Sequence, residues 1–217
     1  MTQRPEALPQ DWRTIARVGE AEIERKRSIF YAYAAPVSTE AEALEILTER
    51  RELRPEAVHH VYAWRVGRRT EHFLQRMSDD GEPSGTGAMP MLQHIEGREL
   101  DDLIVVVSRI WGGTLLGTGG LARAYGDSAA AALETAGIVT MTWSRQYRIT
   151  VDYDLYGALE RLCSDENVAI LEREFGAAVD IDVRLPLRDA ADFLLAVTNL
   201  SAGRAVIQAG DSGWLAG

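Results

Sequence analysis

Residues 78–87, the acidic loop, form the first segment whose side chains could do chemistry. Asp79, Asp80 and Glu82 bring three acids into four residues, and interspersed glycines and a proline disfavour regular structure. Oxygen-rich loops bind hard cations, and neighbouring carboxyl groups can act as acid and base when their pKa values differ. The spacing of an EF-hand is missing, however. We therefore favour acids that cap turns and the following helix over a catalytic or metal site.

The second candidate is the glycine loop, residues 111–120, between a predicted strand and a predicted helix. Its five glycines are Gly112, Gly113, Gly117, Gly119 and Gly120. Glycine lets a ligand approach the backbone closely, and free N–H groups at a helix start attract anions. With Arg109 at the strand end and Arg123 near the first helical turn, the loop would form a site for phosphate or carboxylate. A tight packing turn is an equally good interpretation of the glycines alone.

Several well-known site patterns are absent. No lysine follows the glycines, which excludes the Walker pattern. The GxGxxA match at 117–122 does not directly follow its strand or lead into a second parallel βα unit, which argues against a dinucleotide site. No GxSxG elbow exists. The four histidines lack zinc-ligand spacing: His59, His60, His72 and His94. We expect no cofactor and no metal, and we favour a protein that is not an enzyme.

Composition and charge limit the partners. Of 217 residues, 46% are hydrophobic and 26% charged, close to soluble globular averages. The net charge of −10 repels a phosphate backbone, so contact with RNA needs a local basic patch. The single cysteine, Cys163, fits a reducing compartment. Because no membrane-spanning run and no apolar signal-peptide core are present, we expect a cytoplasmic protein without membrane contact.

Hydrophobic patterning predicts an α+β fold. In the first part of the chain we predict strands at 14–18, 28–34, 58–66 and 72–77, and a helix capped by Ser38 or Thr39. Residues 103–107 form a continuous apolar, β-branched run, which is typical of a strand buried on both faces. Residues 121–136 predict an Ala-rich helix that ends at Gly137.

The second part follows a βαββαβ order, which is the ferredoxin-like arrangement. Its predicted elements are strands at 147–153, 168–175, 178–185 and 204–208 and helices at 155–165 and 190–200. We therefore divide the chain into a loose tail at 1–11, a first domain at 12–140 and a ferredoxin-like domain at 141–217.

Taken together, these motifs resemble the IMPACT family, in its bacterial YigZ-type form. The matching segments are residues 78–86, 105–109, 112–113, 116–121 and 123–125, with 26–30 and 60–64 upstream. The resemblance covers about residues 12–137, and the ferredoxin-like half matches in element order only. It implies an IMPACT-type N-terminal domain whose α/β fold is shared with a domain of a small-subunit ribosomal protein and with domain IV of elongation factor G.

The resemblance also implies a link to the regulation of translation, with binding to RNA or the ribosome and no firmly attached enzymatic activity. Two residues depart from the family pattern. Met89 stands where lysine is usual before Pro90, and Leu115 stands where lysine is common between the glycines. Both changes remove positive charge near the expected anion site.

Three hypotheses follow. The leading one is a non-enzymatic binding protein that regulates translation and contacts the ribosome or structured RNA through Arg109, Arg123 and the glycine loop. The alternative is a small-molecule enzyme or sensor, in which the three acids and the glycine loop face one cleft. The third is a protein-binding adaptor that uses Trp111 and Tyr125 as surface anchors, although a core position is more common for Trp111.

Overall fold

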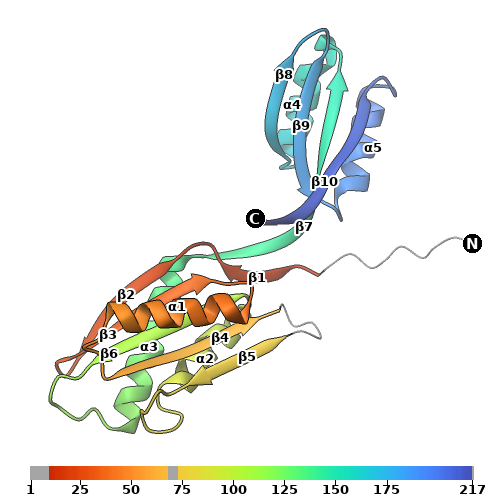
Figure 1. Cartoon of the computed structure of the whole chain (residues 1–217). Coiled ribbons are helices and arrows are strands. Elements are labelled where there is room, and N and C mark those ends of the chain that lie inside the picture. The colour runs from red at the N-terminus through yellow and green to blue at the C-terminus, as the bar shows by residue number, and fades with distance from the viewer. Residues whose placement is uncertain (1–9, 68–72, 217) are drawn as a thin grey trace, which may run out of the picture. The chain divides into compact units, whose positions relative to one another are not determined.

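The computed structural model describes residues 10–67 and 73–216, which form two compact units (Figure 1). One unit comprises Trp12–Thr140, and the other runs from Met141 onward and includes residues 10 and 11. The described residues contain two sheets and five helices, so the predicted α+β class is confirmed.

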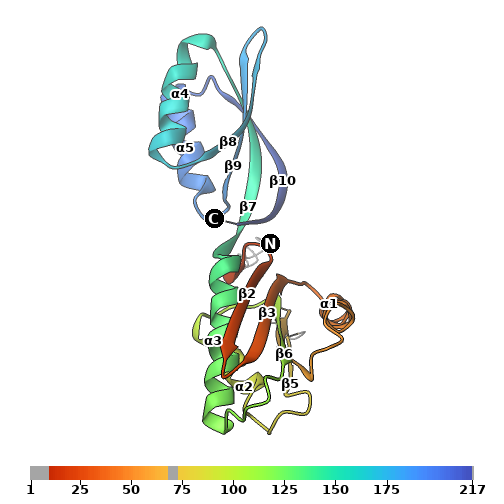
Figure 2. The same ribbon diagram turned by 90° about the vertical axis from the view of Figure 1, so that its left-hand side faces the viewer.

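The first unit is built on a sheet with the strand order β2-β3-β6-β4-β5, antiparallel throughout. Its strands are β2 (Gly19–Arg25), β3 (Ser28–Pro36), β4 (His59–Val66), β5 (Leu74–Ser78) and β6 (Leu103–Ile110). Its helices are α1 (Glu40–Leu53), α2 (Ala88–Gly97) and α3 (Thr118–Ala136). The helices α2 and α3 cover one face of the sheet and α1 covers the other (Figure 2).

The central strand β6 is buried on both faces, as predicted from its apolar run. Successive side chains of a strand point to opposite faces. Val105 and Val107 therefore join the core beneath α2 and α3, whereas Ile104 and Val106 join the core beneath α1. An antiparallel strand needs an all-apolar sequence here because helices cover both faces of the sheet.

The start of the chain differs from the prediction. The strand predicted at 14–18 is instead β1 (Trp12–Ile15), which pairs with β7 (Ile138–Val151). The next strand, β2, has no predicted counterpart, because four of its seven residues are charged. Such a sequence is typical of an edge strand, whose outer face meets water.

The helix predicted after Ser38 or Thr39 begins at Glu40. The Thr39 hydroxyl accepts the N–H of Glu42 at 3.2 Å, and the Glu42 carboxylate accepts the N–H of Ser38 at 2.6 Å. These reciprocal bonds cap the helix N-terminus. The hairpin partner predicted at 72–77 is β5, and His72 lies outside the described residues.

The second unit has the predicted βαββαβ order. After β7 come α4 (Tyr153–Asp165), β8 (Ala169–Phe175), β9 (Val179–Pro186), α5 (Ala190–Leu200) and β10 (Val206–Ala216). The antiparallel strand order is β8-β9-β7-β10, and both helices pack on the sheet around one apolar core. The strand β7 is longer than predicted because it pairs with β10 from Met141 onward.

Of the segment expected to be a tail, residues 1–9 lie outside the described residues. Asp11 accepts a hydrogen bond from the Thr142 hydroxyl at 3.0 Å and pairs with Arg188. Among the five helices of the described residues, none combines the length and apolar character that crossing a membrane requires.

The packing of β2 on α3 predicts a stability effect at Gly19. A β-carbon there would lie 2.2 Å from the carbonyl oxygen of Ala132 and 2.4 Å from the nitrogen of Ala136. We expect Gly19→Ala to lower the free energy of unfolding by about 1–3 kcal/mol, because strand and helix must move apart. Urea unfolding checks this against Gly97→Ala, where the added methyl would meet no atom within 4 Å. Equal stability of the two variants would contradict the close approach.

Candidate functional site

Backbone donors fix the acidic loop at Asp79. Its carboxylate accepts the N–H groups of Gly85 at 2.7 Å, Gly87 at 2.9 Å and Ala88 at 2.8 Å. The helix α2 has Gly87 at its N-cap position, where no side chain can accept these donors. Asp79 therefore supplies the cap from a distance, in line with the capping interpretation of the acids.

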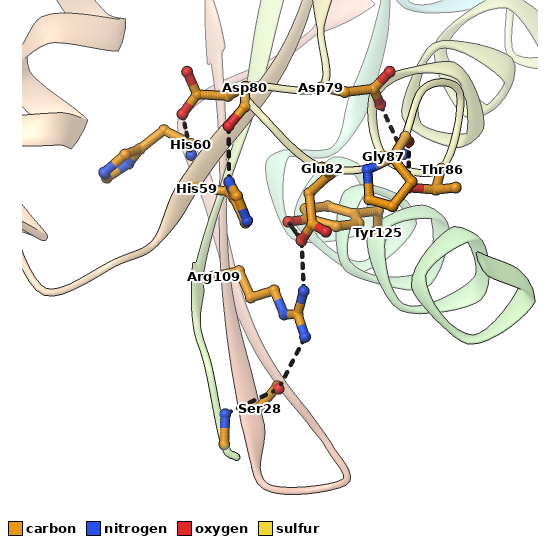
Figure 3. Close-up of polar contacts among 12 residues, drawn as sticks. Ser28, His59, His60, Asp79, Asp80, Glu82, Thr86, Gly87, Arg109 and Tyr125 are labelled. Atoms are coloured by element: carbon orange, nitrogen blue, oxygen red, sulfur yellow. Dashed lines mark hydrogen bonds and ion pairs between the residues drawn. The ribbon is translucent and has the colours of Figure 1, made fainter. Parts of the chain in front are cut away.

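The next acid, Asp80, joins the loop to two histidines of β4. Its carboxylate accepts the backbone N–H of His60 at 2.7 Å and pairs with Arg51 at 2.9 Å. Its carbonyl oxygen lies 2.8 Å from Nδ1 of His59 (Figure 3). Because a carbonyl only accepts, this contact places the hydrogen on Nδ1. The Nε2 atom of a neutral His59 then carries a lone pair.

A buried ion pair joins the third acid to the end of β6. The Arg109 guanidinium donates through Nη1 to Glu82 at 2.6 Å, and the Tyr125 hydroxyl donates to the same carboxylate oxygen at 2.8 Å. Arg109 also donates through Nη2 to Ser28 Oγ at 3.4 Å, and Ser28 Oγ accepts the N–H of Gly112 at 3.1 Å (Figure 3). Burial and the nearby Glu82 charge raise the pKa of Tyr125, so its hydroxyl remains a donor.

This pair determines what the predicted site residues can do. The side chains of Arg109 and Glu82 are only 7% and 3% exposed, so the charge of each is neutralised by the other inside the protein. The three acids also bind three different sets of partners rather than converging on one point. The roles predicted for Arg109 as an anion ligand and for the acids in catalysis stay predictions.

The glycine loop rests on the turn between β2 and β3. A β-carbon at Gly112 would lie 2.0 Å from the backbone carbon of Arg27, so only glycine fits there. Arg27 donates to Thr114 Oγ1 at 2.8 Å, and Lys26 donates to the carbonyl oxygen of Leu115 at 3.3 Å. The turn therefore places two exposed cations beside the loop.

The loop ends at α3, whose N-cap residue Gly117 has a φ of 73°, a conformation that favours glycine. The Leu121 N–H donates to the Gly117 carbonyl oxygen at 2.9 Å and closes the first turn. The preceding helical N–H groups have no acceptor within the helix itself. Arg123 is exposed in this region, and no ion pair joins it to another described residue.

The acidic loop and the glycine loop border one pocket of about 520 Å³. Residues from both loops line it, together with Arg109 and His59 of the sheet: Gly81, Glu82, Pro83, Trp111, Leu116 and Thr118. Trp111 is 54% exposed, so the core position favoured for it is wrong. Tyr125 is fully buried and cannot serve as a surface anchor.

Sequence reasoning missed the place of His59 and of the cations Lys26 and Arg27 in this site. The alternation of β4 carried a signal for His59, since neighbours in a strand point to opposite faces. His59 pairs in register with Arg109 and lines the pocket, whereas Nδ1 of His60 meets Ser108 Oγ at 2.8 Å. No local pattern indicates which cations border a loop that lies more than 80 residues away.

Comparisons with known proteins cover both units. Residues 26–133 match the Impact N-terminal domain, and residues 149–204 match a domain of unknown function, DUF1949. The chain is 33% identical over 202 residues to the IMPACT family member YvyE of Bacillus subtilis, covering 93% of this chain and 92% of that protein. It is 32% identical over 180 residues to the IMPACT family member YigZ of Escherichia coli, covering 83% and 88%.

Two further comparisons differ in how much of the chain they cover. Protein IMPACT of Xenopus laevis is 36% identical over 99 residues, which cover 44% of this chain and 31% of that protein. A crystal structure of a hypothetical protein is 30% identical, with a TM-score of 0.59, and covers 94% of this chain and 99% of its own. The bacterial relatives thus match across most of the chain, and the Xenopus protein matches less than half of it.

The buried ion pair predicts a large effect at Glu82. Glu82→Ala leaves the Arg109 guanidinium buried without its counter-charge, and we expect the free energy of unfolding to fall by about 3–5 kcal/mol. Urea unfolding measures this against Asp127→Ala, which removes an exposed pair with Arg25 and should cost about 0–1 kcal/mol. Similar destabilisation of the two variants would show that the buried pair of Glu82 and Arg109 stabilises the protein no more than an exposed pair does.

Burial of His60 predicts a pH dependence of stability. Burial disfavours the charged imidazole and lowers the pKa of His60. The unfolded chain then binds more protons than the folded one as the pH falls below about 6.5, so the free energy of unfolding decreases there. We expect the urea midpoint of unfolding to decrease as the pH is lowered from about 7.5 to about 5.5, and to decrease less in His60→Gln. The same slope in both proteins would contradict this origin.

Proposed function

Because the chain belongs to the IMPACT family, we propose that it is a non-enzymatic binding protein linked to the regulation of translation, which contacts RNA through its glycine loop. The observation that carries the proposal is the set of exposed cations around this loop. Lys26 and Arg27 contact the loop directly, and Arg123 follows it on α3. In a chain with a net charge of −10, such a local basic rim is what phosphate binding requires.

We define the basic rim as Lys26, Arg27 and Arg123. Its charges differ from that of Arg109 because none of the three forms an ion pair with an acidic side chain of the described residues. Lys26 and Arg27 donate to a carbonyl and a hydroxyl oxygen, both uncharged. The N-terminus of α3 adds backbone donors and the positive end of a helix dipole. In this proposal Arg109 and Glu82 hold the loop in place, and the rim makes the phosphate contacts.

The second unit is a poorer candidate for the RNA contact. Four of its arginines are held by carboxylates: Arg148, Arg173, Arg188 and Arg204. Arg148, for example, donates through Nε and Nη2 to both carboxylate oxygens of Asp182, at 2.9 Å and 2.7 Å. The carboxylate offsets the positive charge of a guanidinium bound in this bidentate way, which weakens its attraction for phosphate. The proposal therefore assigns the RNA contact to the first unit.

One observation favours the alternative of a small-molecule enzyme or sensor. The acidic loop and the glycine loop line the same pocket, and His59 faces it with its tautomer set by Asp80. A neutral imidazole with a free Nε2 is a common general base. The distribution of the acids opposes this function, since Glu82 is neutralised by Arg109 and Asp79 caps α2.

Binding to purified ribosomes and to structured RNA at increasing salt tests the proposed function. We expect the affinity of the wild-type protein to fall with salt. Lys26→Ala/Arg123→Ala should reduce the slope by about 0.7–0.9 for each phosphate that the variant no longer neutralises. The control Arg17→Ala/Arg161→Ala removes the same charge from exposed positions outside the rim. No binding at low salt, or equal slopes in the two double variants, would contradict the proposal.

A further inference from the structure

We propose that the pocket between the acidic loop and the glycine loop holds one unpaired nucleotide of the bound RNA, with its base stacked on Trp111. The inference rests on the proposed function and adds the form of RNA that the site accepts. The basic rim by itself would bind any phosphate backbone. The pocket beside it predicts a preference for single strands.

The exposure of Trp111 is the first observation behind this inference. Among the aromatic side chains of β3, β4 and α3, Phe30 and Tyr125 are at 0% exposure and Trp64 at 1%. The tyrosines of β3 and β4 are half-buried: Tyr31, Tyr33 and Tyr62. Trp111 is 54% exposed beside a pocket, directly after the end of β6. An exposed indole face is a good stacking surface for a nucleic-acid base, because every base has a flat π face.

The backbone next to Trp111 is held in place, so its position does not depend on the ligand. The N–H of Gly112 donates to Ser28 Oγ, and the missing side chain of Gly112 lets the loop touch the backbone of Arg27. Ser28 in turn accepts from Arg109 of the buried ion pair. A rigid platform loses little entropy on binding, which favours stacking.

The pocket also provides polar groups for the rest of a nucleotide. Nε2 of a neutral His59 can accept a hydrogen from a base or a ribose hydroxyl. Arg109 lines the pocket and is buried, and within the described residues its Nε has no hydrogen-bond partner. The start of α3 lines the pocket, and Lys26 and Arg27 of the basic rim contact the glycine loop that borders it, so the phosphate of a bound nucleotide would have cations nearby.

Size and shape favour a single nucleotide over a duplex. The volume of about 520 Å³ falls in the range of about 300–1,000 Å³ that is typical of small-molecule sites. Proteins read unpaired RNA bases by splaying them onto aromatic side chains, whereas paired bases stay inside the helix. A base that enters this pocket must therefore be unpaired.

Binding of a fluorescently labelled oligoadenylate, followed by anisotropy, tests the inference. We compare Trp111→Leu, which removes the ring and keeps an apolar side chain, with Trp111→Phe, which keeps a ring. Thermal unfolding confirms that both variants fold. We expect Trp111→Leu to bind about fivefold to hundredfold more weakly and Trp111→Phe to retain most of the affinity. Oligoadenylate annealed to oligouridylate should compete poorly, and adenosine 5′-monophosphate should compete at high concentration.

The outcomes separate this inference from the proposed function. Binding that needs Lys26 and Arg123 but is unchanged in Trp111→Leu overturns the nucleotide pocket and leaves RNA binding standing. Equally tight binding of the duplex and the single strand would also overturn the nucleotide pocket and leave RNA binding standing. If no RNA binds at low salt, the proposed function fails. In that case we add adenosine 5′-monophosphate and follow tryptophan fluorescence. Quenching in the wild type but not in Trp111→Phe would support the nucleotide pocket, and no quenching in the wild type would overturn it.

Discussion

The ion pair between Arg109 and Glu82 is the interaction on which the first unit depends. Taking two charges out of water is costly, and a buried pair is tolerated only when further hydrogen bonds satisfy both groups. Tyr125 supplies one such bond to Glu82, and Ser28 supplies one to Arg109. These four side chains come from the acidic loop, β6, α3 and β3, so one polar cluster joins segments far apart in the sequence. Both loops around the pocket are fixed through it.

This arrangement separates the charges that build the site from those that can act on a ligand. Arg109 is the most prominent cation in the sequence motif, yet its charge is matched by Glu82 inside the protein. Near the pocket, the cations without an ion pair to another described residue lie at the surface, in the turn between β2 and β3 and on α3. A strongly acidic protein can then present a small positive area beside an apolar pocket, because solvent and salt screen the more distant acids.

The parts of the fold that local patterns determine could be predicted from the sequence. The apolar run of β6, the capped start of α1, the end of α3 at Gly137 and the βαββαβ order all follow from periodicity and caps. The strand β2 could not be predicted from its sequence, because its charged residues reflect its edge position in the finished sheet. The two loops of the candidate site could be named from their composition, but what their side chains contact depends on partners distant in the sequence. Glu82 meets Arg109 across 27 residues and Tyr125 across 43.

The turn beside the glycine loop has a consequence for chemistry on the whole protein. Lys26, whose ammonium donates to the carbonyl oxygen of Leu115, is the single lysine among 217 residues. Every other basic side chain that stays charged at neutral pH is an arginine, which does not react as a primary amine. An amine-selective reagent therefore finds one side-chain target in this chain, and that target lies at the candidate site. Acylation there would remove a positive charge from the basic rim and leave the arginines unchanged.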